Sequence, residues 1–91
     1  MEKRVNVIVR GLVQSVGFRM FIYREASMRS LTGWTRNCPD GSVEIEAQGN
    51  SGLVEELLQR AGIGPSRARV KTMSVRETGI VPDEKEFRLL V

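Results

Sequence analysis

The sequence contains no histidine, and this absence excludes more chemistry than any other feature of its composition. Histidine is the usual base beside serine and cysteine nucleophiles, and it is the commonest metal ligand in proteins. With no histidine and a single cysteine, the chain also lacks the usual ligand set of a zinc site. Catalysis would have to rely on positioning and electrostatics, supplied by arginine, asparagine, backbone N–H groups and water.

Cysteine and long apolar runs are also scarce. The single cysteine, Cys38, cannot form an internal disulfide, so nothing in the sequence indicates an oxidising compartment. No apolar run approaches the roughly 18 residues of a membrane span, and the N-terminus has no signal-peptide core. We therefore expect a cytoplasmic protein with no membrane partner. We also expect it to act as a monomer.

Charge of either sign is modest. Fourteen basic and eleven acidic residues leave a net charge of +3, and the basic residues are spread along the chain. This balance suits a small anionic ligand at least as well as a nucleic acid. The length of 91 residues, with 41% of them hydrophobic, fits a single domain over residues 1–91.

Hydrophobic periodicity predicts the order of strands and helices. Alternation indicates strands, and 3.6-residue spacing indicates helices. The predicted strands are 5–10, 33–38, 43–48, 70–75 and 87–91. The first predicted helix begins at Phe18 and ends near Met28 to Leu31. The second has its N-cap within Gly49-Asn50-Ser51, its apolar stripe over residues 53–61 and its end at Gly62-Ile63-Gly64-Pro65. Between Val70 and Met73 the alternation of apolar and polar residues is shifted by one residue, so we expect a β-bulge or a late start of the strand there. The order β-α-β-β-α-β is the α+β, ferredoxin-like sandwich, a mostly antiparallel sheet with two helices on one face.

The loop between the first strand and the first helix is a candidate phosphate site. A helix start leaves backbone N–H groups without partners, and its dipole favours an anion. Arg19, a cation in the first turn, opposes that dipole and so breaks a local rule. A guanidinium that converges with free N–H groups suits a phosphate. From these residues alone, a plain loop with a solvated arginine is the alternative.

Asn37 is a candidate for orienting water. It stands just before the turn Pro39-Asp40-Gly41 and, in this fold, at the same sheet edge as the loop. Its amide can donate to one partner and accept from another. Phosphoryl transfer needs little covalent help, so a phosphate cradle and an aimed water suffice where the leaving group is good, as in acyl phosphates. The alternative is that Asn37 only stabilises its own turn.

Two blocks of the sequence resemble the signatures of the acylphosphatase family. Gly11-Leu12-Val13-Gln14-Ser15-Val16-Gly17-Phe18-Arg19 is similar to G-x-V-Q-G-V-x-F-R. The second block, similar to G-W-V-x-N-x-x-D-G-x-V-E, is Gly33-Trp34-Thr35-Arg36-Asn37 followed by Asp40-Gly41-Ser42-Val43-Glu44. The likeness covers nearly the whole chain, because further family positions are matched by Gly49, Gly64-Pro65, Val70 and Phe87.

The resemblance implies a ferredoxin-like enzyme that hydrolyses acyl phosphates to carboxylate and inorganic phosphate. It implies no metal and no cofactor, and it makes inorganic phosphate a product and an inhibitor. Arg19 and Asn37 would be the catalytic residues, the first binding the phosphate and the second positioning the attacking water. The phosphate-binding segment would consist of Gln14, Ser15, Val16, Gly17, Phe18 and Arg19.

Four residues depart from the family pattern. Ser15 replaces a glycine inside the cradle and is the departure that bears on catalysis. Thr35 replaces an apolar residue of the buried face, Arg29 takes an apolar place on the first helix, and Ser30 replaces the glycine expected to end it. The last three are expected to affect only stability.

Two other functions compete with hydrolysis. The first is a non-catalytic module that binds phosphate or acyl phosphate, like the acylphosphatase-type domain of larger carbamoyl-transferring maturation proteins. The second is an RNA-binding sheet, which requires aromatic residues on central strands. Only five aromatic residues are present and three fall on the first helix, so we expect no nucleic-acid partner.

Overall fold

The computed structural model describes all 91 residues, which form seven regular elements. In chain order they are β1 (Glu2–Leu12), α1 (Phe18–Met28), β2 (Thr32–Asn37), β3 (Val43–Asn50), α2 (Ser51–Ile63), β4 (Arg69–Thr78) and β5 (Phe87–Leu89). The predicted order of strands and helices is confirmed, with the final β in two pieces. Neither helix is long and apolar enough to cross a membrane.

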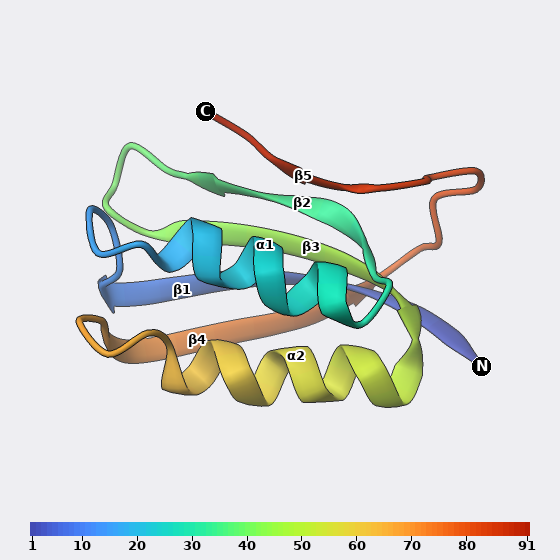
Figure 1. Ribbon diagram of the computed structural model, residues 1–91, viewed down its shortest axis with the longest axis horizontal. Helices are drawn as coiled ribbons and strands as arrows, with labels where there is room; N and C mark the ends of the chain where they lie inside the picture. The colour runs from blue at the N-terminus through green and yellow to red at the C-terminus, as the bar shows by residue number, and fades with distance from the viewer.

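The five strands form one sheet in the order β4-β1-β3-β2-β5. Strand β1 is antiparallel to β3 and β4, β2 is antiparallel to β3, and only β5 runs parallel to its neighbour β2. Both helices lie on the same face of the sheet (Figure 1). The loop after β1, the end of β2 and the C-terminus lie toward the same end of the molecule (Figure 1).

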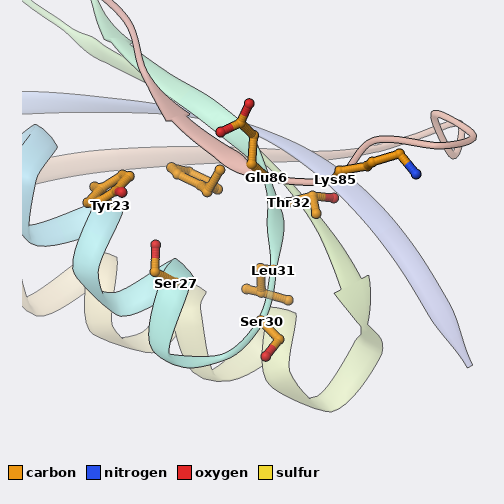
Figure 2. Close-up of a pocket in the computed structure, with 8 residues that line it drawn as sticks. Tyr23, Ser27, Ser30, Leu31, Thr32, Lys85 and Glu86 are labelled. Atoms are coloured by element: carbon orange, nitrogen blue, oxygen red, sulfur yellow. The ribbon is translucent and has the colours of Figure 1, made fainter.

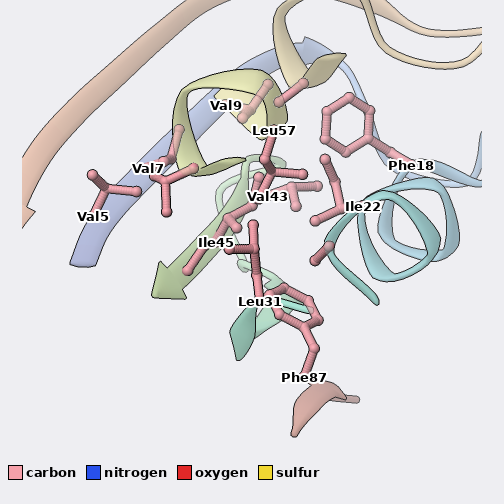
Figure 3. Close-up of a cluster of buried hydrophobic side chains, with 14 of the residues drawn as sticks. Val5, Val7, Val9, Phe18, Ile22, Leu31, Val43, Ile45, Leu57 and Phe87 are labelled. Atoms are coloured by element: carbon pink, nitrogen blue, oxygen red, sulfur yellow. The ribbon is translucent and has the colours of Figure 1, made fainter. Parts of the chain in front are cut away.

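The core lies between that face of the sheet and the two helices. Val5, Val7 and Val9 of β1 stand opposite Ala47, Ile45 and Val43 of β3, and all six side chains are buried. The helices add two buried stripes, seen in part in Figure 3: Phe18, Ile22 and Ala26 on α1, and Val54, Leu57 and Ala61 on α2. Each large apolar side chain contributes about 1.5–3 kcal/mol when fully buried. The alternation read from the sequence thus becomes the packed face.

The shift in apolar alternation along β4 corresponds to a β-bulge, as predicted. Arg10 pairs with Thr72 and the next residue, Gly11, pairs with Val70, so Lys71 is the extra residue. At Gly11 the backbone has φ +134°, and a Cβ atom would stand 2.0 Å from the carbonyl oxygen of Arg69. Only glycine fits this close approach. The bulge therefore directs the end of β1 into the loop that follows.

Most strand ends differ from the predicted ones by one to three residues. Strand β1 begins at Glu2 and ends at Leu12 because β4 and β3 pair with it along most of its length. The predicted N-cap of the second helix is confirmed, because α2 begins at Ser51 and the Asn50 side chain accepts a hydrogen bond from the N–H of Leu53. Strand β5 ends at Leu89 and not at Val91, because pairing with β2 stops at Thr35.

The face of the sheet away from the helices is less exposed than its polar residues predict. Arg4 has a side chain only 3% exposed, and its guanidinium pairs with Glu46 and Glu84, each at 2.7 Å. The Gln48 amide bonds both the N–H and the carbonyl oxygen of Val81. The connection between β4 and β5 therefore covers one end of this face. The polar side chains of β3 on this face, Glu44 and Glu46, are partly buried as a result.

Glu44 shows the electrostatics of the same face. Burial acts to raise the pKa of its carboxyl, but hydrogen bonds from Asn6 and Arg36 outweigh it and hold the pKa below the ordinary value. Arg4, Asn6 and Gln48 are buried on this face and hydrogen-bonded, whereas the buried hydroxyl of Thr78, which stands opposite Arg4, has no hydrogen-bond partner.

Three of the residues that depart from the family pattern have structural roles. The hydroxyl of buried Thr35 donates to the carbonyl oxygen of Glu44 at 3.0 Å. Arg29 lies half-buried and joins the helices, donating to Glu25 of α1 and Glu56 of α2. Ser30 ends α1 with φ +55°, the left-handed conformation that glycine adopts at this position.

Ser30→Gly should raise the free energy of unfolding by about 1 kcal/mol, because a left-handed φ costs a non-glycine residue about 1–2 kcal/mol. Thermal or denaturant unfolding measures the change. Ser27→Gly, inside the same helix, is the matched control and should lower stability, since glycine is a poorer helix former there. Destabilisation by both substitutions would contradict the assignment of strain to Ser30.

Candidate active site

The loop Val13–Gly17 carries a run of free backbone donors. None of its N–H groups donates to an acceptor in the protein. Helix α1 begins at Phe18 without a side-chain cap and without an acidic residue in its first turn. Ser15 and Gly17 both have positive φ, +61° and +78°. Successive N–H groups in such conformations form concavities that bind anions, and the helix dipole adds to the effect.

Arg19 and Asn37 lie on the same pocket, as the sequence predicts. The pocket has a volume of about 210 Å³, and its lining is Val13, Ser15, Gly17, Phe18, Arg19, Met20, Asn37 and Leu89. Three more residues of the predicted phosphate-binding segment therefore line it: Ser15, Gly17 and Phe18. Gln14 and Val16 do not line it, so only their backbone N–H groups remain candidates for phosphate binding.

The guanidinium of Arg19 is positioned by the end of the chain. Its Nη1 donates to the carbonyl oxygen of Leu90 at 2.5 Å, while the N–H of Leu90 donates to the carbonyl oxygen of Thr35 at 2.9 Å. Arg19 forms no ion pair with a carboxylate. Its charge is therefore available to an anionic ligand. Sequence reasoning missed Leu90, because a backbone carbonyl leaves no signal in the residue types.

Asn37 has a half-buried side chain that makes no hydrogen bond within the protein. The adjacent turn is stabilised instead by Asp40, whose Oδ1 accepts from the N–H of Ser42 at 3.0 Å and from its hydroxyl at 2.6 Å. The hydroxyl of Ser42 is the main reason that the pKa of the Asp40 carboxyl lies below its ordinary value. The turn-stabilising role considered for Asn37 thus belongs to Asp40.

Gln14 joins the cradle loop to the turn beyond Asn37. Its Nε2 donates to the carbonyl oxygens of Cys38 at 2.8 Å and Ser42 at 2.9 Å. Both N–H bonds of the amide are used, so the side chain has no donor left for a ligand. This bridge was missed from the sequence. The signal was a glutamine in a loop that otherwise holds small and apolar residues, beside a turn rich in carbonyl acceptors.

The fold and the pocket define a small α+β protein with a phosphate-sized, donor-lined site at one end of its sheet. The chain belongs to the acylphosphatase family, whose sequence model, described as "Acylphosphatase", matches residues 5–89. It is 61% identical over 89 residues to an acylphosphatase of Chlorobaculum tepidum, covering 98% of this chain and 97% of that one. The protein is accordingly an enzyme, an acyl-phosphate phosphohydrolase.

Solved structures agree with this assignment. The crystal structure of acylphosphatase from Bacillus subtilis is 34% identical, with a TM-score of 0.93 and complete coverage of both chains. Full-length HypF in its phosphate- and nucleotide-bound form is 26% identical with a TM-score of 0.91, but the match covers only 12% of that chain. Similarity along the full length to acylphosphatases favours the enzyme over the non-catalytic module.

Ser15→Gly should preserve the fold, raise the free energy of unfolding by about 1 kcal/mol and leave kcat/KM equal or higher. The reason is that φ +61° at Ser15 is a left-handed conformation that costs a non-glycine residue about 1–2 kcal/mol. Thermal midpoints and acyl-phosphate hydrolysis measure the two effects.

Ser15→Ala is the control, since it removes the hydroxyl and keeps the strain. A severalfold loss of kcat/KM in both variants would mean that the hydroxyl binds the phosphate, contrary to this expectation.

Proposed function

We propose that the pocket hydrolyses acyl phosphates with Arg19 and the loop N–H groups holding the phosphate and Asn37 positioning the water. The observation that carries the proposal is the convergence in one pocket of an arginine without a carboxylate partner, an uncapped helix start and a free amide. Arginine and N–H groups stabilise the charge on the phosphoryl oxygens, which is the main requirement of phosphoryl transfer.

In the proposed reaction the oxygen of a water molecule, held by the Asn37 amide, attacks phosphorus. The bond between phosphorus and the bridging carboxyl oxygen breaks, and its electron pair leaves with the carboxylate. The proton of the water passes to a phosphate oxygen, so the products are carboxylate and inorganic phosphate. The lining supports this path, because it contains no carboxylate that could act as a base.

Three further features belong to the same proposal. Inorganic phosphate, as product, binds the cradle and inhibits. The enzyme acts as a monomer, because all the groups proposed for catalysis come from one chain. It works in the cytoplasm on a small-molecule substrate, without nucleic acid, and its one unpaired thiol, Cys38, suits a reducing compartment. Residues 1–91 serve as a single domain.

Arg19→Ala should abolish most activity and weaken inhibition by inorganic phosphate about 10- to 100-fold, because each charge-assisted hydrogen bond contributes about 1.5–3 kcal/mol. Steady-state kinetics with phosphate as inhibitor measure both effects. Arg24→Ala, an exposed arginine on the same helix, is the matched control and should be near wild type. An Arg19→Ala protein with normal turnover and phosphate affinity would contradict the site assignment.

Asn37→Ala should lower kcat while inorganic phosphate still binds, because positioning water matters mainly in the transition state. The kcat and the phosphate inhibition constant separate the two effects. Asn50→Ala is the control: it removes the cap of α2, lowers stability by about 1 kcal/mol and leaves kcat unchanged. Weaker phosphate binding at unchanged kcat would show that Asn37 binds phosphate instead.

A further inference from the structure

The segment that leads from α2 into β4 carries a group of exposed positive charges. Residues 62–76 contain four basic residues and no acidic one. Three of the four, which we call the basic cluster, follow one another at alternate positions: Arg67, Arg69 and Lys71. All three are exposed, and none of them forms an ion pair. Exposed cations without carboxylate neighbours make the electrostatic potential around this segment positive.

The basic cluster lies beside the loop of the proposed phosphate site. Arg69 stands opposite Leu12 in the pairing of β4 with β1, where β1 leads into the loop Val13–Gly17. The same segment approaches the start of α1, because a Cβ atom at Gly64 would stand 3.2 Å from the ring of Phe18. In Figure 1 the loop before α1 and the connection from α2 to β4 lie at the same end of the molecule. The positive potential of the cluster therefore extends over that end.

The opposite end of the molecule has no such excess of positive charge. The connection from β4 to β5 lies there (Figure 1), and its charged residues are Asp83, Glu84, Lys85 and Glu86. A hollow of about 370 Å³ at this end is lined by Lys85 and Glu86, whose side chains point apart (Figure 2). With one charge of each sign, this hollow does not attract anions as the basic cluster does. The charge distribution thus distinguishes the end that holds the phosphate site.

This distribution matters for an anionic substrate. A surface of one sign of charge beside a site raises the local concentration of ligands of the opposite sign, and salt screens the effect. We propose that the basic cluster guides acyl phosphates electrostatically to the phosphate pocket and favours substrates that carry more negative charge. The three residues do not line the pocket, so they act on substrate encounter and not on the chemical step. This inference rests on the proposed function.

The double variant Arg67→Gln/Arg69→Gln tests the guide and leaves Lys71, the extra residue of the bulge, in place. With acetyl phosphate at about 10 mM ionic strength, where charges act over about 30 Å, its kcat/KM should fall about three- to tenfold. The loss should appear in KM, with kcat unchanged. At about 1 M ionic strength, where the screening length is about 3 Å, the difference from wild type should be less than about twofold.

Substrate charge provides a second measurement. Benzoyl phosphate and 4-carboxybenzoyl phosphate share an aromatic ring and differ by one carboxylate, so their contacts with the ring are matched. The ratio of kcat/KM for the carboxylated substrate to that for benzoyl phosphate should fall about two- to threefold in the double variant at low ionic strength, because the added charge gains less attraction. At high ionic strength the ratio should be the same in both proteins.

Two controls separate charge from structure. Arg67→Lys/Arg69→Lys keeps both charges and should keep the wild-type kinetics, because attraction at a distance requires charge and not the guanidinium geometry. Arg24→Gln/Lys85→Gln removes the same net charge from exposed residues outside the cluster, and its kcat/KM should stay within about twofold of wild type.

The outcomes that overturn the inference are distinct from failure of the proposed function. Equal losses of Arg67→Gln/Arg69→Gln at low and high ionic strength, or an equal loss in Arg24→Gln/Lys85→Gln, would show that the basic cluster does not guide the substrate. A wild type that hydrolyses none of these substrates would overturn the proposed function instead. Calorimetric binding of inorganic phosphate at the two ionic strengths would then still test the cluster, with the same expected weakening at low salt.

Discussion

The positive charge of Arg19 has no carboxylate partner in the protein, and the site is arranged around that fact. A cation in the first turn of a helix is unfavourable by about 0.3–1 kcal/mol, and the loop before it leaves its N–H groups without acceptors. The phosphate of the proposed substrate would relieve both costs at once. Hydrophobic burial offsets this cost, because the side chains of Phe18 and Ile22, on the opposite side of the same helix turns, are buried in the core.

Arg19 and Asn37 are positioned relative to each other by contacts between segments that are far apart in the sequence. The Leu90 carbonyl orients Arg19, and the Leu90 N–H returns to β2 two residues before Asn37. Gln14 ties the cradle to the turn on the other side of Asn37. The proposed catalytic pair is thus held by contacts on both sides of Asn37 in the sequence, at Thr35 and at the turn after β2. The parallel pairing of β5 with β2 brings the chain end to this edge.

Local pattern was enough to predict the order of strands and helices along the chain, the helix stripes and the bulge in β4, because each is encoded by apolar spacing within a few residues. Arg19 and Asn37 could be chosen because one breaks a helix rule and both stand in recognisable motifs. The roles of Gln14 and Leu90 could not be predicted, since they depend on which backbone carbonyl lies opposite. Burial of Arg4 likewise depends on Glu84 and on the path of a distant connection.

Two serines occupy left-handed positions, and the structure supports them differently. At Ser30 the helix end is held by hydrogen bonds from its own N–H to Ser27 and from Leu31 to Ala26. At Ser15 the backbone N–H has no such bond, and the restraint comes from Gln14, the preceding residue, through its two bonds to the β2–β3 turn. The anchored neighbour helps to hold Ser15 in its strained conformation. The same glutamine thus links the loop of the proposed phosphate site to the turn that follows Asn37.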